Sequence, residues 1–198
     1  MTSGMMKKNK IHMLLLVLAS LVFSLNLFAS NIEFNVVMEN MSQISRSTAL
    51  FEEEKSFALL NKEIKLSGRL EYIAPDTIIK KTMKPEPELF KVNGNELYIE
   101  KQNGDKHNLI LSNYPLVAVF TEAYRGVLSG DIKKLKNYYD VDFRASSESW
   151  TISLTPLDED ALQYIEMILV EGIGTSILRI TTIESGGDKS IMNIKEKK

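Results

Sequence analysis

The sequence has very few of the residues on which enzyme chemistry most often depends: its 198 residues include no cysteine and only two histidines. Without cysteine the chain forms no disulfide bond and offers no thiolate nucleophile, so buried apolar surface, at about 25 cal/mol per Å², must stabilise its core. Two histidines are too few for a histidine-rich metal site. These absences exclude a disulfide scaffold, a thiol enzyme and a histidine-rich metal centre.

Long hydrophobic runs are equally scarce, and the clearest one lies near the amino terminus. Three lysines between positions 7 and 10 precede the apolar run Met13–Phe28, and Ala29 follows it. This order is typical of a secretory signal peptide. A membrane anchor is the alternative, but the run is shorter than the roughly 20 apolar residues of a spanning helix. We therefore predict that residues 1–29 are a signal peptide cleaved near Ala29, and that the protein is periplasmic.

Acidic residues outnumber basic ones once this segment is removed. Residues 30–198 hold 21 lysines and arginines against 26 aspartates and glutamates, which gives a net charge of −5. Nucleic-acid binding requires a basic surface, so no nucleic-acid partner is expected. The remaining length suits one domain, and we predict a single domain over residues 30–198.

Candidate catalytic groups are few. His107, the histidine that remains after cleavage, follows a turn, where such a side chain is usually solvated. Two acidic runs, Glu52–Glu54 and Asp158–Asp160, are interpreted as exposed, the first alternating across a strand and the second in a loop. No Gly-x-Ser-x-Gly elbow occurs, and Gly172–Gly174 precedes a β-branched strand, as a turn or bulge does. No catalytic residue, metal or cofactor is expected.

Short strand-like segments separated by Gly and Asn turns dominate the rest of the chain. Asn93-Gly94-Asn95 and Asn103-Gly104-Asp105 are tight-turn signals, because Asn and Gly tolerate positive φ. Evenly spaced short strands with such turns are typical of antiparallel hairpins. We predict strands at 45–57, 65–74, 77–84, 97–99, 109–111, 150–155, 164–170, 177–183 and 191–194.

Three segments have helical periodicity instead. Apolar residues recur every three to four positions over 33–44 and over 116–128. Pro115 suits the first position of the second helix, and Gly130 suits a left-handed cap at its end. A third, short helix carries apolar residues from Ile132 to Tyr139.

Together these elements predict an α+β fold that is mainly β. A sheet of nine to eleven antiparallel strands tends to curl into a barrel or half-barrel, and its concave face can receive the apolar stripes of the helices. That face is either ordinary core or the wall of a cavity for an acyl chain, whose burial yields about 0.8 kcal/mol per methylene. The pattern alone leaves both possibilities open.

Several short motifs, in their order and spacing, resemble those of a known family. The motifs are Phe51-x-Glu53-x-Lys55, Gly68-x-Leu70-x-Tyr72-x-x-Pro75, the Asn93–Leu97 turn, Trp150-x-Ile152-x-Leu154-x-Pro156 and Gly187-Asp188-x-Ser190-x-x-x-Ile194. Over nearly all of the chain after the signal peptide, they resemble the periplasmic outer-membrane lipoprotein carrier family, the LolA-like proteins.

The resemblance implies an unclosed antiparallel half-barrel, in a monomer, with helices as a lid over a hydrophobic cavity. It implies an acylated lipoprotein or lipid as cargo, an inner-membrane donor transporter and an outer-membrane acceptor. The candidates for the cavity wall are Phe51, Leu70, Tyr72, Leu97, Trp150, Ile152 and Leu154. The candidates for the lid are Leu116, Val119, Phe120 and Tyr124.

One position departs from the family pattern. Family members place an arginine directly before the proline of the Gly-x-Leu motif, where it helps to latch the lid, whereas this chain has Ala74 before Pro75. Arg69 lies on the same segment but at a different position. The lid is therefore expected to be held differently, and a lipid or glycolipid is an alternative cargo. The alternative function is an envelope module on the same fold that binds a lipid or a partner protein without transferring it.

Overall fold

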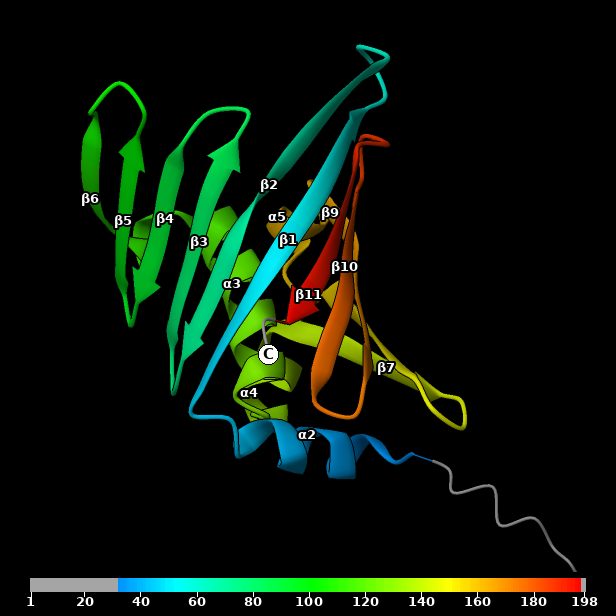
Figure 1. Cartoon of the computed structure of the whole chain (residues 1–198). Coiled ribbons are helices and arrows are strands. Elements are labelled where there is room, and N and C mark those ends of the chain that lie inside the picture. Colours follow the sequence, from blue (N-terminus) through cyan, green and yellow to red (C-terminus); the bar gives the residue numbers. More distant parts are fainter. Residues whose placement is uncertain (1–31, 197–198) are drawn as a thin grey trace, which may run out of the picture. The chain divides into compact units, whose positions relative to one another are not determined.

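The computed structural model describes residues 32–196, so the predicted signal peptide lies outside the described residues. The strands are β1 Arg46–Phe57, β2 Lys62–Ile73, β3 Thr77–Lys84, β4 Glu88–Asn93, β5 Glu96–Lys101, β6 Lys106–Ile110, β7 Tyr139–Ala145, β8 Trp150–Pro156, β9 Ile165–Ile173, β10 Ser176–Glu184 and β11 Lys189–Glu196. They form one antiparallel sheet in the order β6-β5-β4-β3-β2-β1-β11-β10-β9-β8-β7 (Figure 1). β6 and β7 are the two edges and do not pair, which confirms a mainly β fold with an unclosed half-barrel.

The strands of the sheet's centre come from opposite ends of the described chain. β1 pairs with its hairpin partner β2 on one side and with β11 on the other. In this seam Ser56 lies opposite Lys189 and donates a hydrogen bond to its carbonyl oxygen, across 133 sequence positions. The sheet is therefore a meander on each side of a seam made by the first and last strands.

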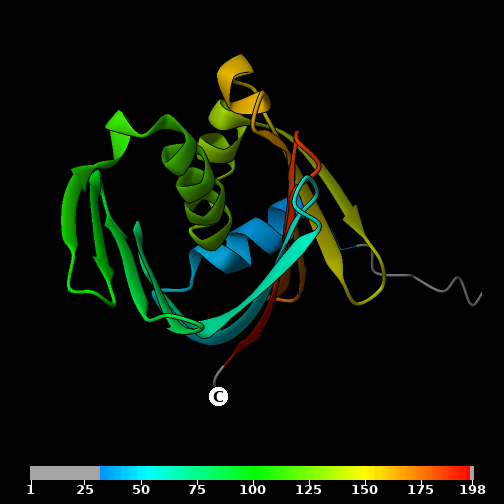
Figure 2. The ribbon, with the colours of Figure 1, turned by 90° about the horizontal axis from the view of Figure 1, so that it is seen from above.

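The described helices gather on one face of the sheet. They are α2 Phe34–Ser42, α3 Pro115–Leu128, α4 Ile132–Tyr138 and α5 Glu159–Leu162, with a 3-10 turn at Leu111–Asn113. Viewed from above, the sheet curves around α3, which lies in its trough (Figure 2). This confirms the predicted placement of helices on the concave face. Within residues 32–196, no helix combines the length and the apolar character needed to cross a membrane.

Most predicted elements are present, and the differences have local causes. β4 and β7 were not predicted. In β7, Tyr139, Val141 and Phe143 alternate with charged residues, as in a half-buried strand, but the helix predicted from Ile132 to Tyr139 takes in the first residue of this strand. The segment 158–160, expected in a loop, instead begins helix α5. There the Asp158 carboxylate accepts a hydrogen bond from the Ala161 amide at 2.8 Å and caps the helix.

Two glycines allow neighbouring groups to pack closely: Gly130 against helix α2, and Gly172 against the ring of Trp150. Gly130 ends α3 with a φ of +66°, as predicted, and a Cβ there would lie 2.0 Å from the carbonyl oxygen of Met38 on α2. Gly172 lies opposite Trp150 in the β8–β9 pair, and a Cβ there would lie 2.3 Å from the indole ring. The indole lies over Gly172, and its Nε1 donates to the carbonyl oxygen of Gly174 at 2.9 Å.

Candidate functional site

A cavity of about 350 Å³ lies between the inner face of the sheet and helix α3. Its volume is within the range of roughly 300–1,000 Å³ that is usual for ligand pockets. The apolar groups that line it from the helix are Val117, Phe120, Tyr124, Val127 and Leu128. The apolar groups that line it from the sheet and the segment before β1 are Ile44, Ala49, Leu70, Tyr72, Ile78, Phe90, Val170, Ile177, Ile180, Met192 and Ile194.

Four of the residues proposed from the sequence meet at this cavity. Leu70 and Tyr72 project from alternate positions of β2, and Phe120 and Tyr124 face them from successive turns of α3. Leu116 and Val119, the other two lid candidates, pack against the main core cluster and do not line the cavity.

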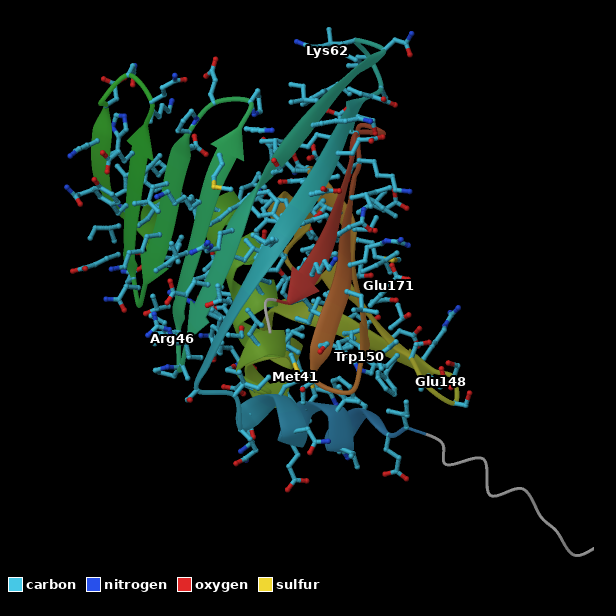
Figure 3. All side chains as sticks on the ribbon, viewed as in Figure 1. Met41, Arg46, Lys62, Glu148, Trp150 and Glu171 are labelled. Atoms are coloured by element: carbon cyan, nitrogen blue, oxygen red, sulfur yellow. The ribbon has the colours of Figure 1, made fainter. Side chains whose placement is uncertain are left out.

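The remaining wall candidates lie outside the cavity lining. Trp150, Ile152 and Leu154 are fully buried in the main core cluster, which also contains the buried Met38 and Met41 of α2. Figure 3 shows Trp150 and Met41 both close to α2, at the end of the sheet opposite Lys62. Leu97 belongs to a second cluster with Val92 and Leu111. The sequence shows which positions are apolar, but not which strands the helices cover.

Phe51 is buried beneath charged groups of the cavity. Its ring lies 4.9 Å from the ammonium nitrogen of Lys80, at cation–π distance. On the neighbouring strand, a Cβ at Gly68 would lie 2.9 Å from the Phe51 ring and 2.0 Å from the Lys81 carbonyl oxygen. Only glycine fits this position of the Gly-x-Leu motif, where the β2–β3 register also shifts.

Charged groups lie inside the apolar cavity, and the sequence did not predict them. The acidic run at 52–54 was expected to be exposed throughout, but Glu53 is buried, because it is the member of this run that points inward, as Phe51 does two positions earlier. Its carboxylate pairs with Lys80 on β3, accepts a hydrogen bond from Ser190 Oγ on β11 at 2.8 Å, and lies 3.6 Å from Lys55 Nζ. A buried carboxylate needs such partners, since an unpaired one is strongly destabilising.

The protonation of this group follows from burial and charge together. Burial opposes ionisation of Glu53, but the charges of Lys80 and Lys55 outweigh it and hold the pKa of the carboxyl below its usual range. Burial lowers the pKa of the Lys80 ammonium, and the nearby Glu53 only partly opposes this effect. Burial also raises the pKa of Tyr124, on the facing helix, to about 12.

Arg125 joins the helix over the cavity to the sheet. Its side chain is almost fully buried, its Nε donates to the carbonyl oxygen of Asp76 at 2.7 Å, and its Nη2 donates to that of Gly94 at 2.7 Å. Its Nη1 donates to the Glu122 carboxylate at 3.0 Å, and Lys134 pairs with the same carboxylate at 2.7 Å. α3 is thus fixed to two hairpin turns, those between β2 and β3 and between β4 and β5.

The arrangement can enclose an apolar chain, with charged groups at one part of its wall. Within residues 32–196, no three His, Cys, Asp or Glu side chains are grouped so that they could hold a metal ion. His107 is exposed on β6, away from the cavity lining. The apolar lining gives the cavity the character of a binding site.

Comparison with known proteins agrees with this reading of the fold. The sequence profile of a family described as "Outer membrane lipoprotein carrier protein LolA-like" matches residues 28–192. No curated protein sequence matches the chain.

Three of the solved structures that are similar to this chain have low sequence identity. A LolA superfamily protein from Nitrosomonas europaea is 11% identical, with a TM-score of 0.45, over 84% of this chain and 94% of that one. A putative outer membrane lipoprotein-sorting protein domain from Vibrio parahaemolyticus is 10% identical, with a TM-score of 0.47, over 83% and 92%. The MucA/MucB complex of Pseudomonas aeruginosa contains a chain 13% identical, with a TM-score of 0.42, over 81% and 53%.

Proposed function

Because this chain belongs to the LolA-like family of outer membrane lipoprotein carrier proteins, we propose that it is a periplasmic carrier. It holds the acyl chains of a lipoprotein or lipid and moves them from an inner-membrane donor to an outer-membrane acceptor. The observation that carries this proposal is the apolar cavity between α3 and the sheet. In the bound state, Leu70, Tyr72, Phe120 and Tyr124 contact the acyl chain.

The cavity suits such cargo because an acyl chain binds through buried apolar surface and needs no hydrogen bonds or charges from the protein. Each methylene buried against the apolar lining contributes about 0.8 kcal/mol, so a long chain binds through area alone. The sheet is open between β6 and β7, and α3 covers its concave face. A movement of α3 away from the sheet gives the chain a way in and out.

The tip of the β1–β2 hairpin supports delivery to a membrane. Leu59 and Leu60 are 93% and 71% exposed there, and Lys62 and Lys65 follow them along β2. The hairpin extends past the neighbouring strands (Figure 1). Two exposed leucines with lysines beside them suit insertion into the interface of a lipid bilayer.

Transfer between vesicles tests the proposal. Protein exported to a bacterial periplasm is purified, its bound lipid is identified by native mass spectrometry and extraction, and passage of a fluorescent acylated peptide from donor to acceptor vesicles is measured. We expect one acylated ligand per chain and accelerated transfer. Leu70→Asp, which puts a charge in the cavity, abolishes both, whereas Leu50→Asp on the exposed face of β1 preserves them. Protein with no bound lipid and no effect on transfer contradicts the proposal.

One observation favours the alternative, a module that binds without transferring. Arg125 fixes α3 to two turns of the sheet through charge-assisted hydrogen bonds, which oppose its movement. In that case the protein retains its ligand when acceptor vesicles are added, and only the transfer step of the experiment fails.

A further inference from the structure

We infer that the cavity selects an acyl chain with an anionic head group, a carboxylate or a phosphate, which binds at Lys80 and Lys55. This inference rests on the proposed function and narrows it to a class of cargo. It is carried by the charged groups on the inner faces of β1 and β3, which an acyl cavity does not otherwise require.

The carboxylate in this group has its partners already. Glu53 accepts from Lys80 at one oxygen, and at the other it accepts from Ser190 at 2.8 Å and faces Lys55 at 3.6 Å. Its side chain is 4% exposed. A ligand entering the cavity therefore meets little of the Glu53 carboxylate.

The ammonium groups of the two lysines, by contrast, have N–H donors that Glu53 does not use. An ammonium group has three N–H donors. The Lys80 and Lys55 side chains are 24% and 43% exposed, and both line the cavity. In the described part of the chain, no carboxylate other than that of Glu53 lies within ion-pair distance of Lys55 or Lys80. Glu88, which also acts on the charge of Lys80, is exposed to solvent.

The charge balance decides the sign of the head group. Lys80, Lys55 and Glu53 together carry one net positive charge at this part of the wall, where an uncompensated charge is unfavourable. Among residues 32–196, three other carboxylates line the cavity, those of Glu71, Glu88 and Glu184, but none is within ion-pair distance of either lysine; Glu71 pairs with Arg46 and Glu88 is exposed to solvent. A singly charged anion neutralises the group, whereas a cationic head group would face two ammonium groups.

Hydroxyl groups continue the polar surface beside the lysines. Lys55, Ser190 and Thr182 lie opposite one another on β1, β11 and β10, and all three line the cavity. Tyr124 reaches Thr182 from α3. The Ser190 hydroxyl already donates to Glu53, so an acidic head group at the lysines can accept a hydrogen bond from the Thr182 hydroxyl while its chain extends along the apolar lining.

Four ligands with the same alkyl chain test this inference. The exported protein is loaded with the uncharged probe N-phenyl-1-naphthylamine, which is then displaced by hexadecanoate, hexadecyl phosphate, hexadecanol or hexadecylamine, each below its critical micelle concentration. We expect the two acids to displace the probe at concentrations about tenfold lower than hexadecanol, and the amine to be the weakest. The better of the two acids identifies the head group as a carboxylate or a phosphate.

The variants separate a local charge effect from the overall charge. Lys55→Met removes the one net positive charge and leaves the Glu53–Lys80 pair in place; it should lose most of the preference for acids and keep the affinity for hexadecanol. Lys81→Met changes the exposed lysine next to Lys80 and should behave as the wild type. Equal displacement by acid and alcohol in the wild type overturns this inference and leaves acyl-chain carriage standing. Failure of the probe and of all four ligands to bind overturns the carrier function as well.

Discussion

Arg125 on helix α3 donates a hydrogen bond of 2.7 Å to the backbone carbonyl oxygen of Asp76, in the turn between β2 and β3. Asp76 lies two residues after Ala74, the position at which family members carry the arginine that latches the lid. In this chain the arginine belongs to the helix and its acceptors belong to the sheet. The helix thus supplies the donor and the sheet supplies the acceptors, the reverse of the family arrangement.

Replacing Arg125 should loosen α3. Arg125→Met removes the donors of two partly buried hydrogen bonds and a buried partner of Glu122, and we expect the free energy of unfolding to fall by about 3 kcal/mol. Arg125→Lys should restore little, because an ammonium cannot reproduce the geometry of three guanidinium hydrogen bonds. Hydrogen exchange of the α3 amides, with chemical denaturation, provides the measurement.

Arg179→Met serves as the control for the loss of an arginine. Arg179 pairs with Glu171 on the exposed face of the sheet at 3.8 Å, so its loss should change stability by less than about 1 kcal/mol. Unchanged exchange in α3 of the Arg125→Met variant would contradict a latch.

Removing one member of the Glu53–Lys80 pair should destabilise the fold, whereas replacing both members with apolar residues should not. Lys80→Met leaves the Glu53 carboxylate with less compensation, and we expect a loss of about 3 kcal/mol in the free energy of unfolding. The double variant Glu53→Leu, Lys80→Met should unfold within about 1 kcal/mol of the wild type, since apolar groups of similar size replace both charges. A double variant as unstable as the single one would show that the pair is indispensable to the core.

The same pair predicts a dependence on pH. The pKa of Glu53 is lowered in the fold, so the pair stabilises the protein above the usual carboxyl pKa of 4.5, and this contribution is lost as the pH falls through the lowered value. In Lys80→Met, burial acts with less opposition and the pKa of Glu53 rises. The difference in stability between wild type and variant should therefore be largest near neutral pH and shrink on acidification, as urea unfolding at several pH values will show.

Adding one methyl group at Gly172 should displace the single tryptophan. Because a Cβ there lies 2.3 Å from the Trp150 ring, we expect Gly172→Ala to lower the free energy of unfolding by about 2 kcal/mol and to change the tryptophan fluorescence. Gly186→Ala, at a glycine whose Cβ would meet open space, is the matched control. Native fluorescence in both variants would contradict the described packing.

The hairpin tip should act in membrane contact and not in stability. Leu59→Asp with Leu60→Asp is expected to reduce association with vesicles by about tenfold while thermal unfolding stays unchanged, because both side chains are exposed. Flotation of the protein with vesicles measures the effect. Leu178→Asp, at a leucine that is 43% exposed on β10, controls for a general loss of apolar surface.

The sequence predicts the elements of this fold better than its cavity. Period-two alternation and the Asn-Gly turns identify most strands, and they select the inward face of β8 correctly, since Trp150, Ile152 and Leu154 all point to the core. The same pattern cannot separate these residues from Leu70, which lines the cavity, because apolar residues of core and wall alternate alike.

The charged members of the site are harder still to predict. Glu53 and Lys80 are 27 positions apart, on two strands with β2 between them, so only the register and curvature of the sheet bring them together. Arg125 looks like a solvated helix residue in the sequence, and its acceptors are backbone carbonyls, which no residue pattern reveals.

The pairing of β1 with β11 has a consequence for how the protein is made. Because the central seam joins residues 133 positions apart, the sheet is incomplete until the last strand has been synthesised. A chain still emerging exposes the inner edge of β1 and the apolar faces of both halves. Such non-local pairing slows folding, so the new chain is open to aggregation until the two halves of the sheet have joined.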